Sequence, residues 1–194
     1  MCMKLPEYLF FTGVPGSHWS AIAQDIESVD GFNTSDHSDV REYSPGTYTG
    51  HKGAYFGEGM EFDTLLIPEY INAAWKEPGG TKIVKSHEWA YKLSLVKELF
   101  PEAWIMLVYR PDMSSYAWWH EAGGFKIDYP SYTAYKNSAN MLGEIAKQNQ
   151  AMLEYGCAND AIWSHYGTPW LQKTFNTDCV ARNQPADILV TIIK

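Results

Sequence analysis

The sequence has no excess of positive charge over negative charge. Its 194 residues include 15 lysines and arginines against 23 aspartates and glutamates, which gives a net charge of −8. A general nucleic-acid-binding protein needs a basic face to neutralise phosphates, so the charge balance argues against that class. A protein of this charge can still bind one small anion through a few well-placed donors.

Long apolar runs and metal-site cysteine spacings are also absent. The apolar run at 8–11 is too short for a signal peptide or a membrane span, so we expect no membrane partner. The three cysteines are odd in number and lack metal or redox spacing, which favours a reduced, cytoplasmic setting. They are Cys2, Cys157 and Cys179. The hydrophilic residues 36–39 and His51 lack ligand spacing, so no metal site is expected.

The sequence shows no repeat, low-complexity tract or linker, and strand and helix patterns alternate along it. The apolar runs predict strands at 8–11, 82–85, 103–109 and 187–193. Helical spacing predicts helices from Ser17 to Ile26, at 61–75 with Pro68 bending or dividing it, and at 89–100, 113–121 and 130–155. Asp112 is expected to cap the helix at 113–121. The alternation predicts one α/β domain over residues 1–194, around a mostly parallel sheet flanked by helices.

One stretch near the start has the pattern of an anion-binding loop. It reads Thr12-Gly13-Val14-Pro15-Gly16-Ser17-His18-Trp19-Ser20, between a predicted strand and a predicted helix. Such a junction presents backbone N–H groups and the positive end of a helix dipole to an anion. Gly13 and Gly16 allow close approach of the backbone, and Thr12, Ser17 and Ser20 add hydroxyl donors. The alternative is an ordinary strand-to-helix turn, since no G-x-x-x-x-G-K-[ST] sequence is present.

Polar residues also follow two later strands. Lys85-Ser86-His87 ends the strand at 82–85, and Arg110 follows the strand at 103–109, with Ser114 and Ser115 a few positions on. Because ligands bind where the carboxyl ends of parallel strands meet the following loops, these residues are predicted to converge on the 12–20 loop. Each also has a structural alternative: a helix-capping His87, a solvated Lys85, and an Arg110 paired with Asp112 or another carboxylate.

Together these motifs resemble the sulfotransferase family, whose members transfer a sulfuryl group from 3′-phosphoadenosine 5′-phosphosulfate (PAPS). Val14-Pro15-Gly16-Ser17 is similar to its phosphosulfate loop, Lys85-Ser86-His87 to its K-T-H segment, and Arg110-Pro111-Asp112 to its 3′-phosphate motif. The resemblance covers roughly residues 8–119 and implies a P-loop-type fold. Two departures stand out: the family's loop lysine aligns with Gly16, and its R-N-P-K-D motif is shortened here. The family's C-terminal phosphate loop is only weakly similar to residues 167–173.

The resemblance also implies roles for individual residues. His87 would be the general base, Lys85 would contact the sulfuryl oxygens, and no metal is required. Residues of the 12–20 loop would bind the 5′ end of the nucleotide, namely Thr12, Gly13, Pro15, Gly16, Ser17, His18, Trp19 and Ser20. Arg110, with Ser114 and Ser115, would bind the 3′-phosphate. The acceptor would be a hydroxyl of a small molecule or carbohydrate, with Tyr55, Phe56 and Glu61 as candidate contacts.

Two other functions fit the same sequence. One is a phosphotransferase of the P-loop type, against which the absent Walker lysine and the lack of an evident Mg²⁺-binding aspartate both count. The other is a non-catalytic nucleotide- or glycan-binding module that kept the fold and lost the loop lysine.

Overall fold

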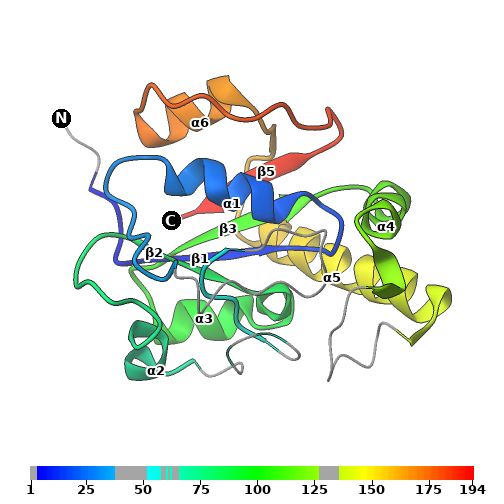
Figure 1. Cartoon of the computed structure of the whole chain (residues 1–194), viewed down its shortest axis with the longest axis horizontal. Helices are drawn as coiled ribbons and strands as arrows, with labels where there is room; N and C mark the ends of the chain where they lie inside the picture. The colour runs from blue at the N-terminus through cyan, green and yellow to red at the C-terminus, as the bar shows by residue number, and fades with distance from the viewer. Residues whose placement is uncertain (1–3, 38–51, 58–59, 61, 63–65, 127–135) are drawn as a thin grey trace.

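A central five-stranded sheet with helices on both faces organises the chain (Figure 1). The structure is a computed structural model, and it describes all residues except 1–3, 38–51, 58–59, 61, 63–65 and 127–135. Within the described part, no helix is both long enough and apolar enough to cross a membrane.

The sheet is mixed but mostly parallel, in the order β2-β1-β3-β5-β4. Its strands are β1 (Tyr8–Gly13), β2 (Lys82–Lys85), β3 (Trp104–Tyr109), β4 (Ser164–His165) and β5 (Leu189–Ile193). β1 pairs in parallel with both β2 and β3, whereas β5 runs antiparallel to β3 and β4. The predicted α/β class and mostly parallel sheet are confirmed. The carboxyl ends of β1, β2 and β3 therefore share one edge.

β1 is the centre of the core. All six of its residues are buried, as the continuous apolar run predicts for a strand covered on both faces. Phe10 faces the core cluster that contains Ile105 and Leu107, and Phe11 faces the cluster that contains Met106 and Val108. This alternation is the two-residue period of a strand.

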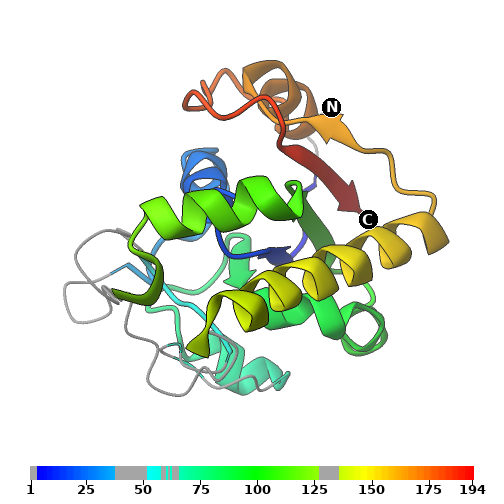
Figure 2. The ribbon, with the colours of Figure 1, turned by 90° about the vertical axis from the view of Figure 1, so that its right-hand side faces the viewer.

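Two layers of helices cover the sheet. α1 (Trp19–Glu27) and α6 (Thr168–Phe175) lie on one face (Figure 1). The opposite face is covered mainly by the 3₁₀ helix η1 (His87–Tyr91), α3 (Leu93–Leu99) and α5 (Ser138–Ala158). α4 (Asp112–Glu121) lies against α5 near the end of β3 (Figure 2). Two short helices, α2 (Pro68–Asn72) and η2 (Gly124–Lys126), complete the described part.

Several element boundaries differ from those predicted. Pro68 begins α2 instead of dividing a longer helix, since its missing N–H costs nothing at the first helical position. The helix predicted at 89–100 is two helices, because Lys92 leaves helical geometry at φ −123°. Asp112 is the first residue of α4, and Pro111 occupies the cap position. α1 begins two residues later than predicted, after a left-handed His18.

Candidate functional site

The loop between β1 and α1 is a tight turn. The Ser17 N–H donates to the Val14 carbonyl at 3.0 Å, with Pro15 and Gly16 between them and Gly16 at φ +81°. Proline followed by a residue of positive φ is the signature of a type II turn, which favours glycine at the second position. The loop is therefore a defined turn, and the Ser17 N–H is used in a hydrogen bond within it.

Both glycines of this loop are required by close packing. A Cβ on Gly16 would lie 1.9 Å from the backbone oxygen of Ser115 in α4. A Cβ on Gly13 would lie 2.8 Å from Ser17 Oγ and 2.9 Å from Trp19 Cβ. The absence of a lysine at position 16 thus has a physical cause, because the backbones of the loop and α4 leave no room for a side chain there.

The loop leads into the N-terminus of α1. His18 occupies the cap position in the left-handed region (φ 63°), and its side chain makes no capping hydrogen bond. The Ser17 side chain precedes the cap, is fully buried, and its Oγ has no hydrogen-bond partner among the described residues. A buried hydroxyl without a partner beside the positive end of a helix is the feature of this loop that best suits an anionic ligand.

His87 is fixed against the loop from the neighbouring strand. Its Nδ1 hydrogen-bonds to the Gly13 carbonyl, and its ring centroid lies 4.1 Å from that of Trp19. Thr12 Oγ1 donates to the His87 carbonyl at 3.3 Å. Because a carbonyl only accepts, Nδ1 carries the hydrogen, and Nε2 of the neutral ring keeps its lone pair.

Burial sets the charge of this imidazole. His87 is 6% exposed, and desolvation lowers its pKa to about 4, against an opposing effect of the Gly13 hydrogen bond. The ring is therefore neutral at pH 7, in the tautomer whose Nε2 can accept a proton.

Arg110 reaches the same loop from the end of β3. Its Nη1 donates to the Gly16 carbonyl at 3.1 Å, and its Nε donates to Asp187 Oδ1 at 3.0 Å. The Arg110 carbonyl accepts from Ser115 Oγ at 3.2 Å and from Asn149 Nδ2 at 2.8 Å. His87, which lies beyond the end of β2, and Arg110, which follows β3, thus bind the two glycine carbonyls of the loop that follows β1.

Ser114 and Ser115 play different parts at this corner. Ser115 is buried, and its hydroxyl is used by the Arg110 carbonyl. Ser114 lies close to the Asp187 carboxylate and helps to stabilise its charge. Partial burial would raise the pKa of Asp187, but Ser114 and Arg110 outweigh this effect and lower it. A carboxylate therefore lies where the sequence predicts a phosphate.

Lys85 does not join this group. It is 1% exposed, and its Nζ lies 2.6 Å from Glu27 Oε1 and 4.0 Å from Asp36 Oδ2, with the Lys52 carbonyl at 3.2 Å. Burial would lower the pKa of Lys85, but Glu27, Tyr55 and Asp36 together outweigh this effect and raise the pKa. Because Glu27 is the last residue of α1, the ammonium is held at the far end of that helix from the loop. The expected contact of Lys85 with a sulfuryl group is therefore not supported.

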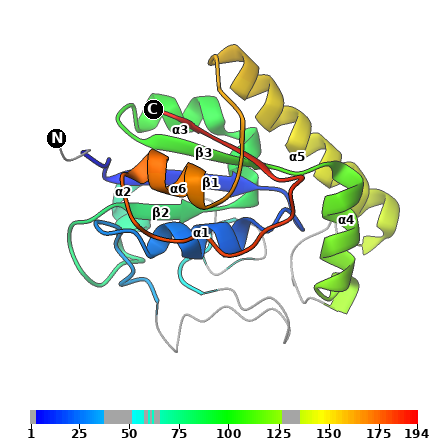
Figure 3. The same cartoon turned by 90° about the horizontal axis from the view of Figure 1, so that it is seen from above.

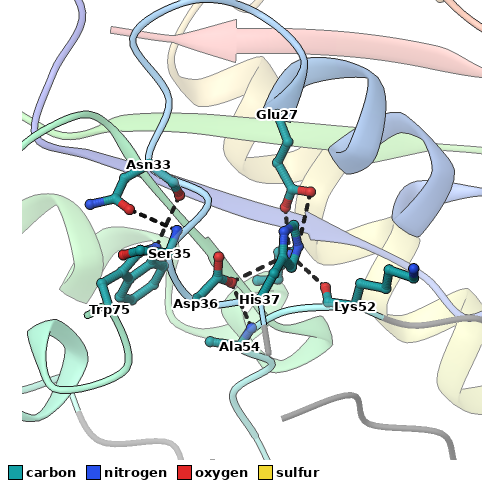
Figure 4. Close-up of polar contacts among 9 residues, drawn as sticks. Glu27, Asn33, Ser35, Asp36, His37, Lys52, Ala54 and Trp75 are labelled. Carbon is teal, nitrogen blue, oxygen red and sulfur yellow. Dashed lines mark hydrogen bonds and ion pairs between the residues drawn. The ribbon is translucent and has the colours of Figure 1, made fainter. Parts of the chain in front are cut away.

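The carboxylates around Lys85 also hold the segment that follows α1. His37 Nε2 lies 3.3 Å from Glu27 Oε2, and the Ala54 N–H donates to Asp36 Oδ2 at 2.7 Å (Figure 4). The hydrogen bond that His37 donates to Glu27 raises the pKa of His37 against the effect of its partial burial. Asp36 and His37 are thus used in ion pairs and hydrogen bonds. Residues 38, 39 and His51 lie outside the described residues.

The candidate acceptor contacts lie elsewhere. Tyr55 and Phe56 are both fully buried, in the two core clusters on opposite faces of the sheet. They run along the outer edge of β2, where the Phe56 N–H donates to the Lys85 carbonyl at 2.8 Å. Neither presents a side chain to an acceptor, because adjacent residues of an extended segment point into opposite core faces. Glu61 lies outside the described residues.

The remaining loop residues divide between packing and the site. Pro15 is buried in the turn, and Trp19 stacks on Phe11 in the core. Ser20 lies close to Tyr55 and lowers the pKa of its phenol, against the larger raising effect of burial. His18 is half-buried against Trp118 of α4, with ring centroids 4.1 Å apart. Burial and the nearby Arg110 charge lower the pKa of His18.

Residues 167–173, which are weakly similar to the family's C-terminal phosphate loop, are not part of this site. Lys173 instead lines a cavity of about 550 Å³ together with Trp170 and Lys194. Lys194 Nζ lies 4.3 Å from the ring of Trp104, the first residue of β3, whereas Arg110 follows the last residue of that strand. The cavity therefore lies toward the opposite edge of the sheet.

Two residues of the site were missed from sequence. Asn149 of α5 donates to both the Arg110 carbonyl and Asp112 Oδ1, and it is 2% exposed. The sequence did indicate that Asn149 is buried, because it lies between the apolar positions Ile145 and Met152 on the buried face of a helix. Asp187 carried no such signal, because its place depends on the antiparallel pairing of β5 with β3.

No protein-family model, no curated protein and no solved structure matches this chain. Its function is therefore inferred from the geometry of the site together with the resemblance of its motifs.

Proposed function

We propose that the protein transfers a sulfuryl group from PAPS to a hydroxyl of a small-molecule or carbohydrate acceptor. The observation that carries the proposal is the neutral imidazole of His87, held through Nδ1 on the Gly13 carbonyl at the start of the loop. That bond leaves Nε2 as a proton acceptor beside the loop that resembles a phosphosulfate site.

The proton and the bonds of this reaction can be accounted for. The donor supplies a sulfuryl group whose bond to a phosphate oxygen breaks as the bond to the acceptor oxygen forms. His87 Nε2 takes the acceptor's hydroxyl proton, and adenosine 3′,5′-bisphosphate is left. Although a pKa of about 4 makes the imidazole a weak base, negative charge bound beside it would raise that pKa.

The binding residues follow from the donors that the site offers. Ser17 Oγ, which has no partner in the structure, and the first turn of α1 are suited to the phosphosulfate end. Arg110 and Ser114 are suited to the 3′-phosphate end through a forked contact. Lys85 has no role in this proposal, because Glu27 binds its ammonium.

The test is transfer from PAPS to a panel of hydroxyl acceptors, read as released adenosine 3′,5′-bisphosphate. His87→Ala should abolish transfer, a loss of at least about 10²-fold, while leaving the affinity for the bisphosphate largely intact. His165→Ala, in the exposed β4, is the matched control and should leave transfer unchanged. Retained turnover in His87→Ala would remove His87 from the mechanism.

A non-catalytic nucleotide-binding module is the second candidate. It is favoured by two observations: position 16 has no room for a lysine, and Lys85 is bound by carboxylates. Calorimetric titration with the bisphosphate and with ATP separates the candidates. Tight bisphosphate binding without turnover on any acceptor supports the module, and preference for ATP supports a phosphotransferase instead.

A further inference from the structure

The Arg110–Asp187 ion pair joins a buried cation to a more accessible anion. The Arg110 side chain is 10% exposed, whereas the Asp187 side chain is 36% exposed. Arg110 is fixed by the Gly16 carbonyl and by the bonds to its own carbonyl from Ser115 and Asn149. Asp187 lies in the irregular segment between α6 and β5. The cation is thus held rigidly, and its carboxylate partner is the member that can move.

The Asp187 carboxylate contacts groups that suit an anionic ligand. It accepts from Arg110 Nε at 3.0 Å, and it lies close to Ser114, which belongs to the first turn of α4. A guanidinium, a hydroxyl and the positive end of a helix together attract an anion. Among the described residues, Arg110 donates to Asp187 through Nε and to Gly16 through Nη1, so Asp187 does not occupy both donors of the guanidinium fork.

We propose that the Asp187 carboxylate competes with the phosphate group of a ligand for the site at Arg110 and Ser114. The phosphate must displace this carboxylate in order to bind. The competing ligand is a phosphate monoester, whose higher charge and three oxygens can engage the guanidinium fork that a single carboxylate oxygen leaves partly unused. The inference rests on the proposed function in that it assigns this phosphate to the 3′ position of a nucleotide.

Competition of this kind lowers apparent affinity in a defined way. The apparent dissociation constant rises by the inverse of the fraction of molecules in which Arg110 is released from Asp187. A ligand that lacks the competing phosphate does not meet this barrier. Removing the carboxylate should therefore tighten binding of a doubly phosphorylated nucleotide and leave a singly phosphorylated one unaffected.

The test compares the wild type, Asp187→Asn and Asp178→Asn by titration calorimetry. Asp178 is the matched control, because it is an exposed aspartate of the same segment and its replacement removes the same charge. Asp187→Asn should bind adenosine 3′,5′-bisphosphate about tenfold more tightly than the wild type, with adenosine 5′-monophosphate unchanged. Asp178→Asn should change neither. If Asp187→Asn does not fold, as judged by its thermal transition, Asp187→Ser takes its place.

Inorganic phosphate is the second probe, and it keeps this inference separate from the proposed function. Phosphate binding, followed by ³¹P NMR, should also tighten in Asp187→Asn and be lost when Arg110→Gln is added. If no variant binds either nucleotide, the proposed function fails while the phosphate result still decides the inference. Equal bisphosphate and phosphate affinities in the wild type and Asp187→Asn would overturn the competition.

Discussion

His87 and Gly13 lie 74 positions apart in the chain, and the histidine Nδ1 hydrogen-bonds to the glycine carbonyl. The bond joins the first residue of η1 to the last residue of β1, and it fixes the imidazole tautomer in a buried setting. Because this contact leaves Nε2 as a proton acceptor while burial keeps the ring neutral, it links the fold directly to the proposed chemistry.

The burial of His87 makes stability depend on pH. Its pKa falls from the ordinary value of 6.5 to about 4 on folding, so between these pH values the unfolded chain binds more protons than the folded one. Stability therefore decreases as pH falls from 6.5 to 4, by up to about 3 kcal/mol from this residue. Urea unfolding at pH 7, 5.5 and 4.5 should show a smaller decrease in His87→Gln than in the wild type. His165→Gln, at an exposed position, should follow the wild type; parallel losses in all three proteins would contradict the assignment.

Gly16 and Gly79 form a matched pair for testing the loop. Both have positive φ, +81° and +79°, but a Cβ on Gly16 would meet Ser115 O at 1.9 Å, whereas one on Gly79 would meet nothing within 4 Å. Gly79→Ala should cost about 1 kcal/mol for its backbone conformation alone. Gly16→Ala should cost about 3 kcal/mol or more, because the loop must move away from α4. Chemical denaturation measures both, and equal costs would show that loop and α4 are not packed as described.

The local elements of the site could be predicted from sequence, but its long-range pairings could not. The apolar runs and helical spacing identify β1, β2, β3 and α1, and parallel strands place their carboxyl ends together. The partners of Lys85 and Arg110 depend instead on where the ends of α1 and β5 lie in space. The sequence patterns around Glu27 and Asp187 do not indicate that these carboxylates pair with Lys85 and Arg110.

The same limit explains the position of Tyr55 and Phe56, which the sequence analysis gives as candidate contacts of the acceptor. Tyr55 and Phe56 instead pair with the edge of β2 and complete the core on both faces, a role that only the sheet order reveals.

Lys85 is expected to act on stability more than on catalysis. Lys85→Met would remove the buried cation of Glu27 and leave this carboxylate to the partly exposed His37, and breaking a buried pair typically costs about 3–5 kcal/mol. Adding Glu27→Gln should recover part of this loss, a coupling that a double-mutant cycle measures. Lys82→Met is the control on the same strand: its partner Glu7 is 61% exposed and stays in water, so the cost should be under about 1 kcal/mol. Additive effects of Lys85→Met and Glu27→Gln would contradict the buried pair.

Two buried serines distinguish a residue kept for a ligand from one kept for the fold. Ser17 and Ser115 are both fully buried, but Ser115 Oγ donates to the Arg110 carbonyl, whereas Ser17 Oγ has no partner. Ser115→Ala should destabilise by about 1 kcal/mol through its lost hydrogen bond. Ser17→Ala removes an unsatisfied buried hydroxyl, so thermal unfolding of the ligand-free protein should show no loss, or a gain of up to about 1 kcal/mol.

Ligand binding should reverse the order of the two serines. If Ser17 Oγ donates to the phosphosulfate end of the nucleotide, Ser17→Ala should weaken binding of adenosine 3′,5′-bisphosphate roughly tenfold, since hydrogen bonds to charged groups are the stronger ones. Ser115→Ala, which retains the Asn149 bond to the Arg110 carbonyl, should weaken it less. A buried hydroxyl that lowers the stability of the free protein is explained if a ligand binds it. A Ser17→Ala variant that is destabilised and binds the bisphosphate with wild-type affinity would therefore contradict the anion-binding role of this loop.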